Sequence, residues 1–211
     1  MIKTISDSDC KLVYDYIQFA GPISDDFFLE LIKYFKKRKY AKGEIILKEG
    51  DVEFRSNIVA KGVVHQFVYD EDIPITSNIS PQGLSFNSLK SYIEGTPSVE
   101  IQEAITDVEI LSIEKKDIEI LSKKWTEMAY VMYKVHESIL LDRENRMSLL
   151  QYRSPSKRFQ LFHEMVVRSN LMLKSTPDKY IASYLNMTPQ QYSKEKHLQR
   201  RFDKQGLVKK T

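Results

Sequence analysis

Residues 180–201, YIASYLNMTPQQYSKEKHLQRR, gather side chains that can contact a nucleic acid. Amide and hydroxyl groups come first and basic groups follow, within what would be one helix beginning at Pro189. Glutamine suits adenine and lysine suits guanine in the major groove, whereas contacts to phosphates add affinity without reading sequence. The candidate DNA-contacting residues are Thr188, Pro189, Gln190, Gln191, Ser193, Lys194, Lys196, His197, Arg200 and Arg201.

Two helices joined by a tight turn would have to present these side chains. The first helix would span about 177–185, and Asn186 can adopt the left-handed conformation that ends it. Met187 would fill the angle between the helices, and Thr188 would cap the second one. The pattern predicts a helix-turn-helix, whose second helix lies in the major groove. The inward-facing residues would be Ile181, Ala182, Leu185 and Tyr192.

The charge of the chain is unevenly divided. Residues 151–211 contain 13 Lys and Arg against 4 Asp and Glu, whereas residues 1–150 have a net charge of −6. A basic end on an acidic body suggests a polyanionic partner for that end. The alternative interpretation of the basic run is an ordinary solvated helix face.

Short strands and turns fill the chain from Tyr40 to about Lys116. Their spacing predicts a compact antiparallel barrel or roll. Before them, residues 24–40 have the pattern of a helix capped by Ser24. The predicted strands lie within 42–51, 57–83 and 98–113, the last of these being a strand pair that turns near Thr106 and Asp107.

After Lys116 the pattern becomes helical, with a short helix over 116–125 and a long one from 126 to about 151. A helix this long has little of its own domain to bury against, so we predict that it pairs with a second subunit. An ordinary core helix is the alternative. A further helix begins at Pro155 and runs to about 170. The predicted dimer contacts are Met128, Met132, Val135 and Ile139.

Other features narrow the class of protein. The chain opens without a secretory signal, and no stretch approaches the roughly 18 apolar residues that span a membrane, so we expect a cytoplasmic protein. The single cysteine, Cys10, leaves no multi-cysteine metal or iron–sulfur site. No phosphate-binding loop or HExxH motif is present. We therefore predict neither an enzyme nor a bound metal or cofactor.

The order of these parts resembles the CRP/FNR family of bacterial transcription regulators, in the short form common in Bacteroidetes. KGEIILKEGD resembles the family's strand–turn signature, VAKGVVHQFVYDED its following strands, and YIASYLNMTPQQYSK its DNA-reading motif. The resemblance implies an α+β chain with an antiparallel β-roll over 1–122, a dimerisation helix over 123–151 and a helix-turn-helix domain over 152–211. It also implies a homodimer that binds two-fold DNA half-sites and, for an activator, RNA polymerase.

The chain departs from the family at the cyclic-nucleotide pocket. In nucleotide-binding members a Gly-Glu pair holds the ribose and an arginine pairs with the phosphate. Here the pair reads Gly83-Leu84, and the arginine position falls on Ser98 with Glu100 nearby. We therefore predict no cyclic AMP in the usual pose, although a different small ligand remains compatible with the sequence. The pocket positions are Gly83, Leu84, Ser85, Ser98, Val99 and Glu100.

The DNA-reading motif departs from the family as well. Three base-contacting positions fall on Pro189, Gln190 and Lys194, where typical members have Arg, Glu and Arg. Only KQGLVKKT follows the second helix, so the family's β-wing would be curtailed. Two alternatives stay open: a ligand-binding or protein-interaction module whose helix-turn-helix does not read DNA, and a cupin-type metal enzyme.

Overall fold

The computed structural model describes residues 5–166 and 169–204. The chain divides into two compact units, Met1–Leu140 and Leu141–Thr211. Their boundary falls inside one continuous helix, α5 (Thr126–Leu150). The domain boundaries predicted from the sequence lie near the two ends of this helix.

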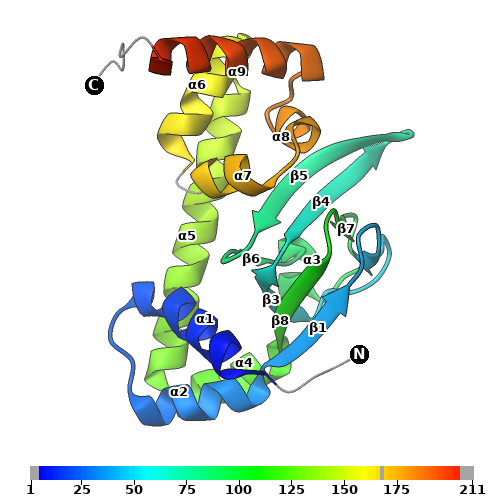
Figure 1. Ribbon diagram of the computed structural model, residues 1–211. Coiled ribbons are helices and arrows are strands. Elements are labelled where there is room, and N and C mark those ends of the chain that lie inside the picture. Colours follow the sequence, from blue (N-terminus) through cyan, green and yellow to red (C-terminus); the bar gives the residue numbers. More distant parts are fainter. Residues whose placement is uncertain (1–4, 167–168, 205–211) are drawn as a thin grey trace. The chain divides into compact units, whose positions relative to one another are not determined.

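The first unit contains an antiparallel β-roll made of two four-stranded sheets (Figure 1). One sheet has the strand order β1-β8-β3-β6 and the other β2-β7-β4-β5. The strands are short and separated by turns, as the spacing in the sequence predicted. The strands are β1 (Lys36–Tyr40), β2 (Ile45–Leu47), β3 (Arg55–Lys61), β4 (Val63–Asp70), β5 (Ile73–Pro81), β6 (Ser85–Phe86), β7 (Ile101–Ala104) and β8 (Val108–Glu114).

The turns explain how these strands are distributed. β4 and β5 form a hairpin whose turn contains the acidic run 70–72, where Glu71 has a φ of 54°. β7 and β8 do not pair with each other as predicted: β7 pairs with β2 and β4, and β8 with β1 and β3. The chain crosses between the sheets at Thr106 and Asp107. Gly62 packs there, and a Cβ on it would lie 2.3 Å from the carbonyl oxygen of Asp107.

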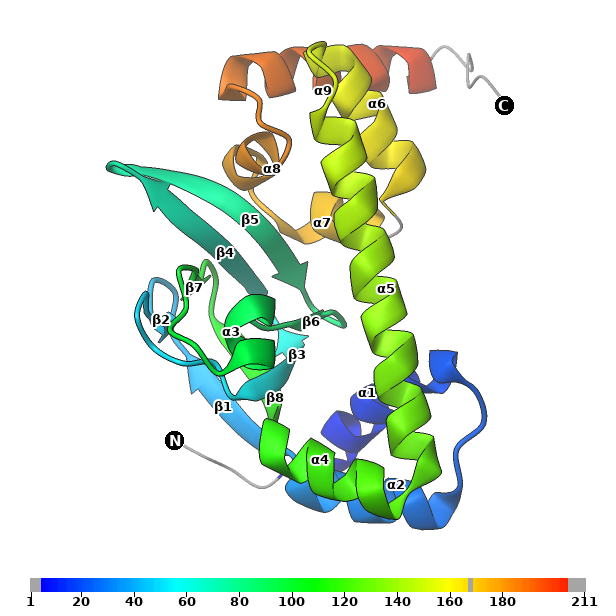
Figure 2. The same cartoon turned by 180° about the vertical axis from the view of Figure 1, so that it is seen from behind.

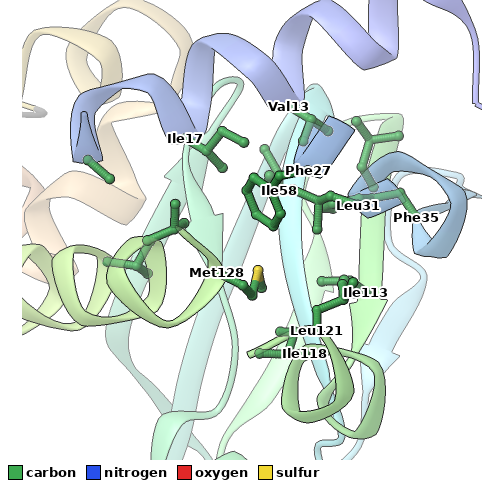
Figure 3. Packing of buried hydrophobic residues seen from close by; sticks show 14 residues of the cluster. Val13, Ile17, Phe27, Leu31, Phe35, Ile58, Ile113, Ile118, Leu121 and Met128 are labelled. Carbon is green, nitrogen blue, oxygen red and sulfur yellow. The ribbon is translucent and has the colours of Figure 1, made fainter. Parts of the chain in front are cut away.

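Helices cover one side of the roll and share a core with it (Figure 3). Val13, Phe27 and Leu121 are fully or almost fully buried in this core, together with Ile58 of β3. α1 was not predicted, although Ser6 and Asp9 form a capping box at its start. The helices are α1 (Asp7–Ile17), α2 (Asp25–Leu31), α3 (Leu89–Glu94) and α4 (Lys115–Lys124), with 3-10 turns at Gln18–Ala20 and Ile32–Tyr34.

The helix predicted over residues 24–40 is correct only in its first half. Ser24 caps α2 by accepting a hydrogen bond from the Phe27 amide, as predicted. After a short 3-10 turn, residues 36–40 become the edge strand β1, paired with β8. Lys37 forms an ion pair with Glu109 on that neighbouring strand, so cross-strand charge pairing favours a strand where the local pattern favoured a helix.

The expected dimer stripe is largely covered by the chain's own first unit. Met128 and Val135 are buried in the core with α1 and α2, and Met132 and Ile139 pack partly against it. The premise that this helix lacks intramolecular cover is therefore wrong, because α1 supplies that cover (Figure 2). The opposite face of α5 exposes Tyr130, which is 50% exposed.

The second unit is helical and begins with the end of α5. α6 (Pro155–Met165) is capped by Ser154 and is shorter than the helix predicted to reach 170. α7 (Ser169–Ser175) leads into α8 (Asp178–Tyr184) and α9 (Pro189–Lys204), which are the two helices of the predicted helix-turn-helix. α9 crosses the end of α6 and contacts it (Figures 1 and 2). The predicted curtailed wing covers residues 204–211, of which Lys204 ends α9 and residues 205–211 lie outside the described part of the chain.

Candidate nucleic-acid interface

The turn between α8 and α9 has the backbone geometry that the sequence predicts. Asn186 adopts the left-handed conformation with a φ of 51°. The Met187 amide donates to the carbonyl oxygen of Ala182 over 2.9 Å, and the Met187 side chain is only 7% exposed. These contacts close the turn tightly, so the start of α9 is fixed relative to α8.

α9 begins with a reciprocal capping box. The Thr188 hydroxyl accepts a hydrogen bond from the Gln191 amide, and the Gln191 side-chain oxygen accepts one from the Thr188 amide over 3.0 Å. This bond occupies one of the two lone pairs of the Gln191 side-chain oxygen and holds the side chain against the start of the helix. A glutamine that reads adenine needs both its oxygen and its NH2, so this capping bond competes with that contact.

The other candidate residues fall into two groups. Lys196 is already paired, because its ammonium lies 2.6 Å from Asp178. Within the part of the chain that the structure describes, the rest form no side-chain hydrogen bond or ion pair and are exposed to solvent. α9 thus presents a row of polar and basic side chains that are available to a partner. Pro189 is the first residue of the helix. These available side chains are Gln190, Ser193, Lys194, His197, Arg200 and Arg201.

Tyr192 anchors this helix from its inner side. It is 1% exposed and packs edge-on against Phe159 of α6, with ring centroids 5.6 Å apart. Burial raises the pKa of the Tyr192 hydroxyl, so the residue stays neutral. The expected inward residues of α8 are likewise buried: Ile181, Ala182 and Leu185 are each at most 1% exposed. The exposed groups therefore lie on a helix whose other face is locked in the core.

The predicted effector pocket lies around β6, α3 and the start of β7. Ser98 is buried, and its hydroxyl forms hydrogen bonds with the Ser88 hydroxyl, over 2.8 Å, and with the backbone of Glu100. Ser85 accepts a hydrogen bond from Tyr16, which ties α1 to β6. Among the described pocket positions Gly83 and Val99 are exposed, Leu84 and Glu100 are half-buried, and none carries a positive charge.

A buried polar network lies beside these pocket residues. Glu53 is 1% exposed and accepts hydrogen bonds from the Arg55 amide and, over 3.1 Å, from the Gln102 side chain. Burial raises the pKa of the Glu53 carboxyl, because the charged form loses solvent there. Gln66, fully buried, bonds to Asn78 and to the Asn87 carbonyl. The polar groups of the roll interior are therefore mostly engaged with one another.

This network was not predicted from the sequence. Its signal was present in β7, where Gln102 occupies an inward position between Ile101 and Glu103. An apolar hollow of about 280 Å³ was also not predicted. It lies between residues 20–23 and the first turns of α5, away from the predicted pocket, and Tyr130 and Val131 line it.

Among the residues that the structure describes, no helix combines the length and the apolar character needed to cross a membrane. No group of three or more His, Cys, Asp or Glu side chains in those residues could hold a metal ion. His65 is buried, and its Nε2 lies 2.9 Å from the Thr76 hydroxyl oxygen.

No protein-family model and no curated protein matches the sequence. Solved structures do match. FixK2 from Bradyrhizobium japonicum aligns with a TM-score of 0.65 at 17% identity, covering 81% of this chain and 85% of that chain. The c-di-GMP responsive regulator CLP from Xanthomonas campestris gives 0.61 at 17% identity, covering 84% and 93%. The catabolite activator protein of Thermus thermophilus gives 0.54 at 17% identity, covering 93% and 90%.

Identities this low establish the fold and nothing finer. The roll followed by a helical domain is nevertheless matched over most of the chain in each case. The α+β class predicted from the sequence is confirmed, and the chain has the CRP/FNR-like fold.

Proposed function

We propose that this chain is a homodimeric, sequence-specific DNA-binding regulator of transcription. The main support for this proposal is the start of α9. There, exposed polar side chains without hydrogen-bond partners among the described residues project from a helix that is capped by Thr188 and anchored by the buried Tyr192. Side chains near the N-terminus of such a helix are those that reach base edges. A protein of this kind would act in the cytoplasm and would not be an enzyme.

Gln190, Ser193 and Lys194 are the proposed base-reading residues. Gln190 can make the two-bond contact to adenine, and Lys194 can contact guanine. Arg200, Arg201 and His197 would contact phosphates, and Lys196 would have to exchange its ion pair with Asp178 for one. Thr188 and Pro189 shape the start of the helix rather than read bases, and Gln191 is restricted by its capping bond.

The proposed dimer contact is the exposed face of α5 rather than the stripe predicted from the sequence. Tyr130, Tyr133 and Leu140 are between 50% and 64% exposed. Tyr133 and Leu140 are seven residues apart, and this spacing keeps both on one side of the helix, as in paired helices. A second copy of this chain is the proposed occupant, because the CRP/FNR resemblance implies a homodimer paired through this helix.

We propose that the roll does not respond to cyclic AMP. A phosphate at the Ser98 position would meet a buried hydroxyl that is already bonded and would meet Glu100 nearby. Loss of one charge-assisted pair weakens binding by roughly 1.5–3 kcal/mol, before any repulsion. Cyclic AMP at millimolar concentration should leave the melting temperature unchanged, and a clear upward shift would refute this part of the proposal.

The central experiment selects bound sequences from random duplex DNA with ligand-free, full-length protein across a salt series. A two-fold symmetric site with a steep salt dependence is the expected result. The double variant Lys194→Ala/Arg200→Ala should lose the site. The control Lys48→Ala/Lys123→Ala removes the same charge from exposed positions of the first unit and should retain it.

The alternative proposal is a protein-interaction module whose helix-turn-helix reads no bases. It predicts weak, sequence-blind binding to DNA by the unmodified chain. It also predicts that the Lys194→Ala/Arg200→Ala variant keeps its protein partner. RNA polymerase is a partner that we propose on the family resemblance alone.

Sedimentation equilibrium tests the proposed dimer face. Tyr133→Asp and Leu140→Asp should each shift the chain from dimer to monomer, because a charge would be buried in an apolar contact. Ile120→Asp is the matched control, since Ile120 is 54% exposed on α4. Monomer in all three variants, or in none, would contradict the assignment.

A further inference from the structure

The carbonyl groups that end α8 point toward two arginines of the same unit. The last carbonyls of a helix have no partner within it and need donors from elsewhere. Here the residues concerned are Tyr184, Leu185 and Asn186, which form the turn before α9. Whatever fills these acceptors also fixes the direction in which the chain leaves α8.

Arg158 of α6 supplies the donors for two of these carbonyls. Its Nε donates to Leu185 and its Nη2 to Asn186, both over 2.8 Å. Its Nη1 donates to the carbonyls of Tyr152 over 2.6 Å and Arg153 over 3.1 Å. One guanidinium therefore joins the turn to the segment between α5 and α6.

Arg158 is buried, being 7% exposed. No ion pair to it occurs among the residues that the structure describes, so backbone carbonyls alone balance its charge. Burial of a cation is unfavourable unless its donors are all used. A leucine or methionine would fill the same space without the free-energy cost of burying a charge. The presence of arginine therefore indicates that its hydrogen-bond donors are required at this position.

Arg146, in the last turns of α5, donates hydrogen bonds to the carbonyl of Tyr184, which precedes the two carbonyls bound by Arg158. Its Nε and Nη2 donate to the Tyr184 carbonyl over 3.2 and 3.1 Å. Its guanidinium also lies over the Tyr184 ring, 4.4 Å from the ring centroid. The end of α8 is thus held by one arginine from α5 and one from α6.

We infer that Arg158 and Arg146 are positioning residues for DNA reading: they hold the turn that sets the angle of α9. The inference rests on the proposed function. Neither residue would touch DNA; each acts through Tyr184, Leu185 or Asn186. A lysine at either position would keep the charge but lose the planar, multi-donor guanidinium that reaches several carbonyls at once.

The test uses Arg158→Lys and Arg146→Lys in the full chain. Binding is measured to the selected site and to a scrambled duplex. We expect affinity for the selected site to fall about 10-fold, while affinity for the scrambled duplex and its salt dependence stay unchanged, because phosphate contacts are untouched. Arg153→Lys makes the same substitution on an exposed side chain and should change neither affinity.

A second control variant and a second measurement distinguish the proposed positioning role from a general loss of stability. Leu161→Val destabilises the same helix through a buried apolar residue and should keep the ratio of specific to nonspecific affinity. Hydrogen exchange of the Leu185, Asn186 and Met187 amides should quicken about 10-fold in Arg158→Lys but not in Leu161→Val.

The outcomes are distinct. A specific-to-nonspecific ratio within twofold of the unmodified chain, or an equal loss in Leu161→Val, would overturn the inference. If the unmodified chain selects no site, the proposed function fails instead. In that case unchanged exchange at the three amides would also refute the role of the arginines in holding the turn, and faster exchange would support it.

Discussion

The interior of the roll and the surface of α9 contain the same kinds of polar side chain, but these are buried and hydrogen-bonded in the roll and exposed on α9. In the roll, Gln66 and Gln102 are completely buried and bonded to other protein groups. On α9, Gln190 and Ser193 are exposed and form no side-chain hydrogen bond to any residue that the structure describes. Amide and hydroxyl groups therefore hold the first region closed and leave the second available.

This difference shows which region is prepared for a partner. A buried polar group without a bond is unfavourable by roughly 1–3 kcal/mol, so removing a hydrogen-bonded member of the roll network should lower the stability of the fold. A surface glutamine bonds to water and can exchange that bond for one to a base at little cost. The comparison predicts that damage to the roll changes stability, whereas damage to α9 changes binding.

The largest expected effect comes from breaking the roll network with Glu53→Ala. The change leaves the Gln102 side chain and the Arg55 amide without their acceptor. We expect a loss of roughly 3 kcal/mol in the free energy of unfolding. Urea denaturation measures it, and DNA affinity of the folded protein should stay within a factor of about 2.

Glu49→Ala is the control for this variant, because Glu49 is an exposed acidic residue of the same unit. It should leave the stability within about 0.5 kcal/mol of the unmodified chain. If Glu53→Ala weakened DNA binding while leaving stability intact, the assignment of separate roles to the two regions would be wrong.

The second effect comes from the exposed arginines at the end of α9. Arg200→Ala/Arg201→Ala should reduce affinity about 30-fold for every duplex, at roughly 1 kcal/mol per phosphate contact. The salt dependence should become shallower by about two charges. Fluorescence anisotropy across a salt series measures both, and unfolding should be nearly unchanged. A loss confined to the selected site would instead assign base contacts to these arginines.

Several parts of this structure could be predicted from local sequence patterns. The turn at Asn186, the cap at Thr188 and the proline that begins α9 depend on neighbouring residues alone, and all three are confirmed. The roll was also predictable, because strand and turn residues alternate along the chain. The role of the α9 side chains as DNA contacts stays a prediction.

Other parts depend on contacts between residues far apart in the chain. Residues 36–40 form a strand because their backbone pairs with β8, some 70 positions later, where Lys37 also meets Glu109, and no local pattern contains that pairing. The Met128 stripe fits a dimer seam until α1 is known to cover it. Arg158 could not be identified from its sequence position, because its partners are backbone carbonyls, which every residue has.

Two adjacent glutamines on α9 should respond differently to replacement by alanine. Gln190→Ala should abolish the preference for one base in each half-site, a loss of about 1–3 kcal/mol of discrimination. Gln191→Ala should retain that preference and lower stability by about 1 kcal/mol, because it removes half of the capping box. Repeating the DNA selection with each variant tests this. A changed base preference in Gln191→Ala would show that the capping bond breaks on DNA.

The smallest effect is a pH dependence of the roll that Glu53→Gln should remove. Because burial raises the pKa of the Glu53 carboxyl, the folded chain holds this proton more tightly than the unfolded chain. Its stability contribution is fully present below the unfolded pKa, near 4.3, and declines as pH rises through the folded pKa. One proton can contribute a slope of at most about 1.4 kcal/mol per pH unit.

Glu109 titrates in the opposite sense. The hydrogen bonds from Lys37 and Lys39 lower its pKa, so its contribution is lost as pH falls. The stability of the unmodified chain alone therefore mixes both trends, and the difference between it and Glu53→Gln isolates the Glu53 effect. That difference, measured by urea denaturation between pH 4.5 and 8, should move against the unmodified chain as pH rises. A flat difference would mean that Glu53 titrates alike in the folded and unfolded chains, and the roll interior would then be as open to water as the α9 surface.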